Sequence, residues 1–119
     1  MAKRVQMLTP AEETALLTAW KTRKDYKARA RLVTSYMPLA TGMAERFARN
    51  GTAPLPDLVQ EAAFALMQAI DNFDMTKNAR ISTLAPYYVR AALMRYAMDF
   101  AGVVRVGTNL PDKKVFTNM

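Results

Sequence analysis

The chain contains the stretch DLVQEAAFALMQAIDNFD, residues 57–74, followed by ISTLAPYYVR, residues 81–90, and these two stretches carry its clearest structural pattern. At about 100° per residue, the apolar residues of the first stretch fall on one arc, and its acids and amides fall on the opposite arc. This pattern is typical of an amphipathic helix that packs on a core through one face. The second stretch predicts a basic, aromatic helix, and neighbouring helices of opposite charge favour two different partners. The predicted core-facing arc of the first helix consists of Leu58, Val59, Ala62, Ala65, Leu66, Ala69, Ile70 and Phe73.

Two further helices are predicted on the N-terminal side. Residues 9–12 read TPAE, with threonine as the cap, proline at the first helical position and glutamate three residues after the cap. This helix is expected to run to about Thr22. Asp25 is expected to cap a second, longer helix that ends near Asn50, with Gly51 as its stop signal.

Proline and serine positions refine these predictions. Pro38 interrupts the second helical segment, so we expect a kink or a break near Tyr36. The acidic helix is expected to run from about residue 57 to residue 72. Ser82 is predicted to cap the basic helix, which is expected to end near Gly102.

The chain is therefore predicted to be all-α, a single compact domain of four to five helices over residues 1–119. Residues 103–119 are turn-rich between Gly107 and Pro111 and are expected to begin a further helix. Neither an alternating strand pattern nor an internal repeat occurs. No apolar run is long enough to predict a membrane span, and no export signal is apparent.

Composition narrows the possible functions. The chain has no cysteine and no histidine, which argues against disulfides, thiolate metal sites and hydrolytic chemistry. We expect no enzyme activity, no metal ion and no cofactor. The net charge is +7, yet residues 51–75 hold four acids and no base. This distribution predicts a polyanion binder that also docks on a basic protein surface, and the alternative is a small protein that is simply basic.

The polar arc of the acidic helix contains two apolar residues, Phe64 and Met67. A large apolar side chain ringed by acids and amides is typical of a binding hot spot with a polar rim. The alternative is that Phe64 packs under the N-terminal helix. The polar arc otherwise consists of Asp57, Gln60, Glu61, Gln68 and Asp71.

The basic helix combines aromatic rings with cations, as single-stranded nucleic acid requires. Its predicted buried arc consists of Val89, Leu93, Tyr96, Ala97 and Phe100. Alternatively, Tyr87 and Tyr88 close over the core with only their hydroxyls in water. The predicted exposed side holds Leu84, Tyr87, Tyr88, Ala91, Arg95 and Met98, with Arg90 on its flank, Lys77 and Arg80 before the helix and Arg105 after it.

The order of these two helices closely resembles region 2 of bacterial sigma factors of the sigma-70 family, which binds RNA polymerase and opens promoter DNA. In that family, Asp-Leu-(Ile/Val)-Gln-Glu followed by Leu-Met marks the helix that docks on the coiled coil of the polymerase β′ subunit. Ala62 and Ala63 stand where the family usually places Gly and Asn. The resemblance implies polymerase contacts for Asp57, Gln60, Glu61 and Met67, to which the face argument adds Phe64.

The pattern Ser-Thr-x-Ala-x-aromatic-aromatic-(Ile/Val)-Arg at residues 82–90 resembles the promoter-melting segment of the same family. It implies that Tyr87 and Tyr88 support the edge of the opened −10 element. Leu84 stands where an aromatic side chain stacks on the flipped base, so melting is expected to be weaker or differently tuned. Phosphate contacts are implied for Lys77, Arg80, Arg90, Arg95 and Arg105.

The resemblance is to an alternative, heat-shock-like factor, with residues 1–25 similar to region 1.2, 26–102 to the region 2 core and 103–119 to the start of the next region. The tail DKKVFTNM, residues 112–119, is an imperfect match to the heat-shock box, and we expect a fragment of a longer factor or, alternatively, a complete short protein. The implied partners are core RNA polymerase through β′, the single-stranded non-template −10 element of promoter DNA, and an anti-sigma factor, all in the cytoplasm. The alternatives are a free-standing adaptor or decoy that docks on polymerase without opening DNA, and a general RNA binder.

Overall fold

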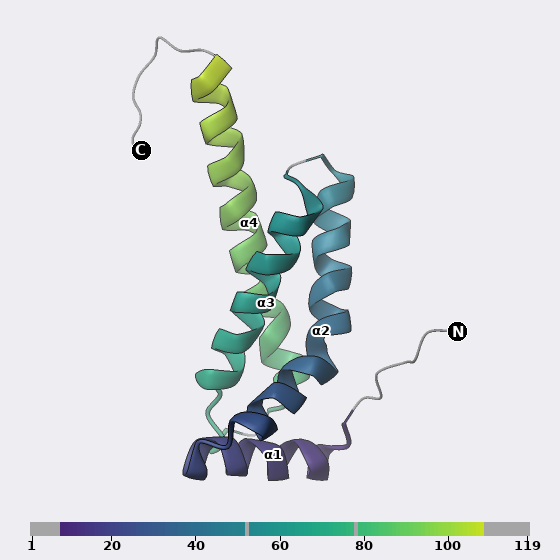
Figure 1. Cartoon of the computed structure of the whole chain (residues 1–119), viewed down its shortest axis with the longest axis vertical. Coiled ribbons are helices and arrows are strands. Elements are labelled where there is room, and N and C mark those ends of the chain that lie inside the picture. The colour runs from purple at the N-terminus through teal and green to yellow at the C-terminus, as the bar shows by residue number, and fades with distance from the viewer. Residues whose placement is uncertain (1–7, 52, 78, 109–119) are drawn as a thin grey trace, which may run out of the picture.

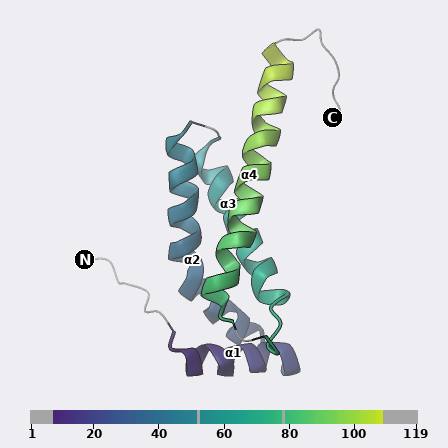
Figure 2. The same ribbon diagram turned by 180° about the vertical axis from the view of Figure 1, so that it is seen from behind.

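The computed structural model describes residues 8–51, 53–77 and 79–108, with the backbone alone for residues 103–108. Over this part of the chain it contains four helices and no strand, which confirms the all-α prediction. The helices are α1 (Pro10–Arg23), α2 (Tyr26–Arg49), α3 (Leu55–Asp71) and α4 (Ile81–Thr108). In Figures 1 and 2, α2, α3 and α4 run alongside one another and α1 lies across one end of them.

The first two helices begin where the sequence predicts. The Thr9 hydroxyl accepts from the Glu12 amide at 3.1 Å, and the Thr9 amide donates to the Glu12 carboxylate at 2.9 Å, which completes a capping box. Lys24 closes α1 in the left-handed conformation, with φ of 52°. The Asp25 carboxylate then accepts from the amides of Lys27 and Ala28 and caps α2.

Proline inside α2 bends the helix without ending it. Pro38 lies within Tyr26–Arg49, and α2 stays helical on both sides of it. Figure 1 shows that α2 changes direction along its length. A proline removes one backbone hydrogen bond and crowds the preceding turn, which favours a bend over a straight helix. The kink predicted from Pro38 therefore occurs, and the alternative of a break does not.

Three predicted boundaries are wrong. Helix α3 begins at Leu55, two residues before the predicted Asp57. Ser82 lies inside α4 and does not cap it, because α4 already begins at Ile81. Helix α4 also continues past Gly102 to Thr108, since a single glycine weakens a helix without ending it. The predicted tail motif at residues 112–119 lies outside the described residues.

The core lies between α2, α3 and α4. The predicted arc of α3 is buried as expected, except that Val59 is half-buried. On α4, Val89, Leu93 and Ala97 are buried, whereas Tyr96 and Phe100 are half-buried and pack against the core. No helix in the described part of the chain is both long and apolar enough to cross a membrane. The largest fully buried apolar side chains are Tyr36, Leu32, Leu58, Leu66, Ile70, Ile81, Leu93 and Val89.

Candidate protein-binding and nucleic-acid-binding surfaces

The outward face of α3 presents Phe64 to solvent. Its side chain is 51% exposed, so the alternative that it packs under α1 is wrong. Gln60 and Gln68, one turn before and after it, are exposed, and Glu61 and Met67 are half-buried beside them. A solvent-exposed aromatic ring between two amides and a carboxylate is suited to burial in an interface with a binding partner.

Asp57, at the start of this face, already has a partner within the chain. Its carboxylate accepts a hydrogen bond of 2.9 Å from the Tyr96 hydroxyl on α4. This bond, together with burial, raises the pKa of Tyr96. Asp57 therefore ties the first turn of α3 to α4, and any contact with a binding partner would share its oxygens with Tyr96.

The outward face of α4 combines an exposed ring with cations. Tyr87 is 72% exposed, which excludes the alternative that it closes over the core. Arg90 and Arg95 are exposed as well, and so are the apolar side chains of Met94 and Met98 along the same helix. The face can offer a flat ring for stacking and guanidinium groups for phosphates.

The other predicted members of this face are less accessible. Tyr88 is half-buried and packs against the core, which agrees with the alternative that its ring covers the core. Leu84 is also half-buried against the core. Lys77 is exposed in the connection before α4. The side chain of Arg105 lies outside the described part of the chain, although its backbone is helical.

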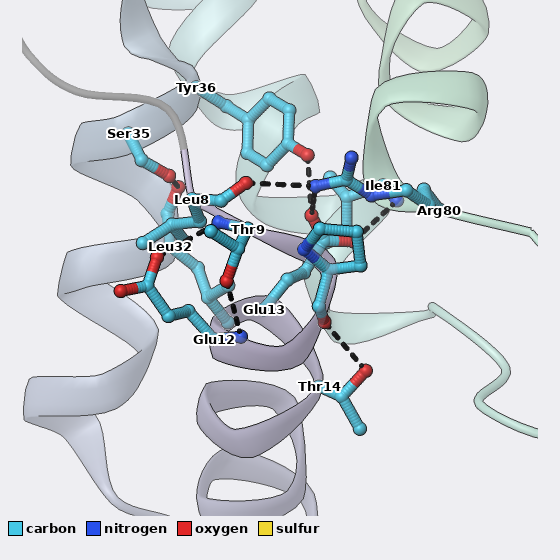
Figure 3. Close-up of polar contacts among 11 residues, drawn as sticks. Leu8, Thr9, Glu12, Glu13, Thr14, Leu32, Ser35, Tyr36, Arg80 and Ile81 are labelled. Carbon is cyan, nitrogen blue, oxygen red and sulfur yellow. Dashed lines mark hydrogen bonds and ion pairs between the residues drawn. The ribbon is translucent and has the colours of Figure 1, made fainter.

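Arg80 is engaged inside the domain (Figure 3). Its Nη2 donates to the Glu13 carboxylate at 2.8 Å and to the Leu8 carbonyl at 3.1 Å. The guanidinium joins α4 to α1, and its hydrogen bond to Glu13 raises the pKa of Arg80. A phosphate contact by Arg80 would have to compete with this ion pair, so Arg80 differs from Arg90 and Arg95 in its accessibility.

Glu13 is the residue that organises this contact, and the sequence interpretation missed it. Only 3% of it is exposed, and its oxygens accept from the Tyr36 hydroxyl at 2.6 Å and from the Ile81 amide at 2.9 Å, besides Arg80. The Ile81 amide is one of the unpaired donors at the start of α4, so a side chain of α1 caps α4. The signal was present, since Glu13 shares the helical face of Leu17 and Trp20, which are buried.

Burial and this network also change the chemistry of Tyr36. Desolvation and then the hydrogen bond to Glu13 raise the pKa of Tyr36 to about 12. The phenol therefore stays neutral and remains a donor to the buried carboxylate. A pocket of about 280 Å³ opens beside Glu13, bordered by α1 and by Lys77 and Arg80. In the described residues, no group of three or more Asp and Glu side chains is arranged to hold a metal ion.

This chain is similar in sequence to proteins of one known family. The family described as sigma-70 region 2 matches residues 32–99. The chain is 31% identical over 117 residues to the RNA polymerase sigma factor RpoH of Caulobacter vibrioides, an alignment that covers 98% of this chain and 39% of that protein. It is 31% identical over 117 residues to RpoH of Zymomonas mobilis, with 98% and 38% covered. To the RNA polymerase sigma factor SigA of Listeria monocytogenes it is 34% identical over 107 residues, with 90% and 28% covered. The chain thus spans less than half the length of these relatives.

Proposed function

This chain belongs to the sigma-70 family, and we propose that it acts as the region 2 module of a heat-shock-like transcription initiation factor. In this proposal, the outward face of α3 binds core RNA polymerase through the β′ subunit. The outward face of α4 contacts the single-stranded non-template strand of the promoter −10 element. The observation that carries the proposal is the exposure of Tyr87 together with Arg90 and Arg95 on α4, while Phe64 is exposed among amides and a carboxylate on α3.

The polymerase contact is supported by the contrast between the two sides of α3. One side of α3 packs in the core, whereas Phe64 on the other side is exposed to water. An aromatic ring exposed in this way adds little to the stability of the free chain. A hot-spot residue of this kind typically contributes 2 kcal/mol or more, or roughly 30-fold in affinity. Phe64→Ala and Glu61→Lys are therefore expected to weaken binding to core polymerase by at least about 30-fold.

A pull-down with core polymerase tests this contact, with circular dichroism to verify that helicity is unchanged. Glu45→Lys is the matched control for Glu61→Lys, because Glu45 is exposed on α2 and the charge change is identical. Variants at Phe64 and Glu61 that bind core polymerase like the parent chain would remove the α3 assignment.

The DNA contact is supported by the exposure of Tyr87, Arg90 and Arg95 on one helix. Base stacking on an aromatic ring contributes about 1–3 kcal/mol, and phosphate contacts make affinity depend on salt. Tyr87→Ala is therefore expected to reduce opening of the −10 element while binding of core polymerase is retained. Tyr88 packs against the core, so Tyr88→Ala is expected to reduce stability as well as opening.

Permanganate footprinting of a promoter with a full-length factor that carries each change measures strand opening directly. If Leu84 encloses a flipped base only by apolar contact, Leu84→Tyr is expected to increase opening by adding a ring. Normal polymerase binding combined with no strand opening in the parent factor would favour an adaptor or decoy that docks on polymerase instead. Unchanged opening in Tyr87→Ala would remove the α4 assignment.

A further inference from the structure

The junction between α1 and α2 carries an exposed aromatic ring among cations that belong to neither α3 nor α4. The Trp20 ring is buried and has three neighbours: the Lys24 ammonium at 5.0 Å, the Arg29 guanidinium at 5.1 Å and the Tyr26 ring at 5.1 Å. Tyr26 meets Trp20 edge-on, with an interplanar angle of 61°, and remains 69% exposed. We call Lys24, Tyr26 and Arg29 the junction cluster.

The junction cluster is fixed in place by the end of α3. Arg29 donates two hydrogen bonds of 2.8 Å to the Asp71 carboxylate, and Lys21 donates to the Asp71 carbonyl. Figures 1 and 2 show the α1–α2 junction beside this end of α3. Arg29 is thus held against the end of α3 and Tyr26 begins α2, while Lys24 lies in the two-residue turn between α1 and α2.

The cluster is continuous with the proposed DNA surface. Asn72 follows Asp71 directly, and its amide nitrogen lies 3.5 Å from the Tyr88 hydroxyl on α4. From Tyr88, the surface therefore passes over Asn72 and Asp71 to Arg29 and reaches Tyr26. The path joins the half-buried Tyr88 ring on α4 to the exposed Tyr26 ring at the start of α2.

The charge along this path suits a polyanion. Asp71 is paired with Arg29, which lowers the pKa of Asp71, and the Asp25 carboxylate is occupied by the amides that it caps. Lys24 is exposed, and its ammonium lies 5.0 Å from the centre of the Trp20 ring. Residues 21–29 hold five Lys and Arg residues and one Asp, so positive charge stays in excess next to the exposed ring even when Asp71 is counted.

We propose that the junction cluster is a second binding site for single-stranded nucleic acid, with one base stacked on Tyr26 and a phosphate at Lys24. The inference rests on the proposed function, because the strand that reaches Tyr26 is the one that leaves Tyr87 and Tyr88. A flat ring beside a cation matches the alternation of bases and phosphates along a strand. An acidic protein segment would use the cations and gain much less from the exposed ring.

The test measures binding of the full chain to a fluorescently labelled oligodeoxythymidine of about 16 nucleotides at low salt. Tyr26→Ala is expected to weaken binding about 5- to 10-fold, whereas Tyr26→Phe, which keeps the ring, is expected to bind like the parent chain. Leu55→Ala is the control, since it removes an exposed large apolar side chain from the start of α3 and should leave oligonucleotide affinity unchanged. Lys24→Gln is expected to reduce the slope of log affinity against log salt by about one. Arg49→Gln, an equal charge change at the exposed far end of α2, is expected to leave the slope unchanged.

The outcomes separate this inference from the proposed function. If Tyr87→Ala weakens binding and Tyr26→Ala does not, the junction site is wrong and the α4 surface stands. If Tyr26→Ala weakens binding and Tyr87→Ala does not, the junction site stands and the α4 assignment fails. No binding of the parent chain at low salt would overturn the junction site. The junction site would also be wrong if Lys24→Gln lost binding to polyglutamate while Tyr26→Ala bound the oligonucleotide like the parent chain. That combination would identify an acidic protein partner.

Discussion

Two arginine–carboxylate pairs hold this domain together, with the same separation but different surroundings. Arg80 and Glu13 join α4 to α1 at 2.8 Å, and Arg29 and Asp71 join α2 to α3 at 2.8 Å. The Glu13 side chain is 4% exposed and the Asp71 side chain is 38% exposed. Water screens the Arg29–Asp71 pair. The buried Glu13 carboxylate is stabilised by hydrogen bonds from protein donors, because little water reaches it. Burial of the carboxylate, more than the distance between the charged groups, is therefore expected to set how much each pair contributes to the free energy of unfolding.

The largest effect is expected from Glu13→Gln. The change removes the charge that compensates Arg80 and leaves the Tyr36 and Ile81 donors with a weaker or misplaced acceptor. Breaking a buried pair in this way is expected to lower the free energy of unfolding by about 3 kcal/mol. Urea denaturation followed by circular dichroism measures the loss, with Glu45→Gln as the matched control at an exposed site of α2. Equal stability of Glu13→Gln and Glu45→Gln would show that burial does not distinguish the two pairs.

An intermediate effect is expected at alkaline pH from Tyr36, the neutral donor to Glu13. The pKa of Tyr36 is raised from 10.0 to about 12 in the folded chain. Its contribution is therefore fully present below pH 10 and is lost as the pH rises towards 12, where the folded state also releases the proton. The difference between these two pKa values corresponds to about 2.7 kcal/mol.

Unfolding of the parent chain and of Tyr36→Phe, compared from pH 8 upwards, isolates this contribution. The difference in stability between them is expected to be constant up to about pH 10 and to shrink above it. Tyr87→Phe provides the control, because the Tyr87 ring is exposed. If the difference in stability between the parent chain and Tyr36→Phe did not change with pH, the pKa of Tyr36 would not be raised by its buried hydrogen bond to Glu13.

The smallest effect is expected from Asp71→Asn, which breaks the exposed pair. The loss should be about 0.5 kcal/mol and should fade as salt is added, because solvent screens both groups. Arg29 lowers the pKa of Asp71, so the contribution is present above the ordinary value of 3.8 and disappears as the pH falls below it. Denaturation at low and high salt checks this. A loss as large as that of Glu13→Gln would contradict the role given to burial.

The sequence predicted best where local periodicity and burial agree. The arc of α3 and the exposure of Phe64 and Tyr87 follow from helical spacing, because each residue's environment repeats that of its neighbours one turn away. The Thr9 and Asp25 caps could be predicted because both act on their own helices. These elements depend on residues close in the sequence.

The sequence predicted least where a residue's partner lies far along the chain. Glu13 and Ile81 are 68 positions apart, and no local pattern indicates that one caps the helix of the other. Arg80 was assigned to phosphate because its charge suits DNA equally well, and only the position of α1 shows that Glu13 is its partner. The end of α4 was missed because Gly102 is compatible with both a stop and a continued helix.

The contact between Glu13 and α4 has an evolutionary consequence. Positions 13, 36 and 80 form one hydrogen-bonded unit around a buried carboxylate, so a substitution that alters the charge at one of them changes the selection on the other two. Homologous chains that replace the acid at position 13 are expected to replace the base at position 80 as well, while the outward residues of α4 vary independently. Helices α1 and α4 should therefore be inherited as a matched pair, and chimaeras that exchange only one of them should fold poorly.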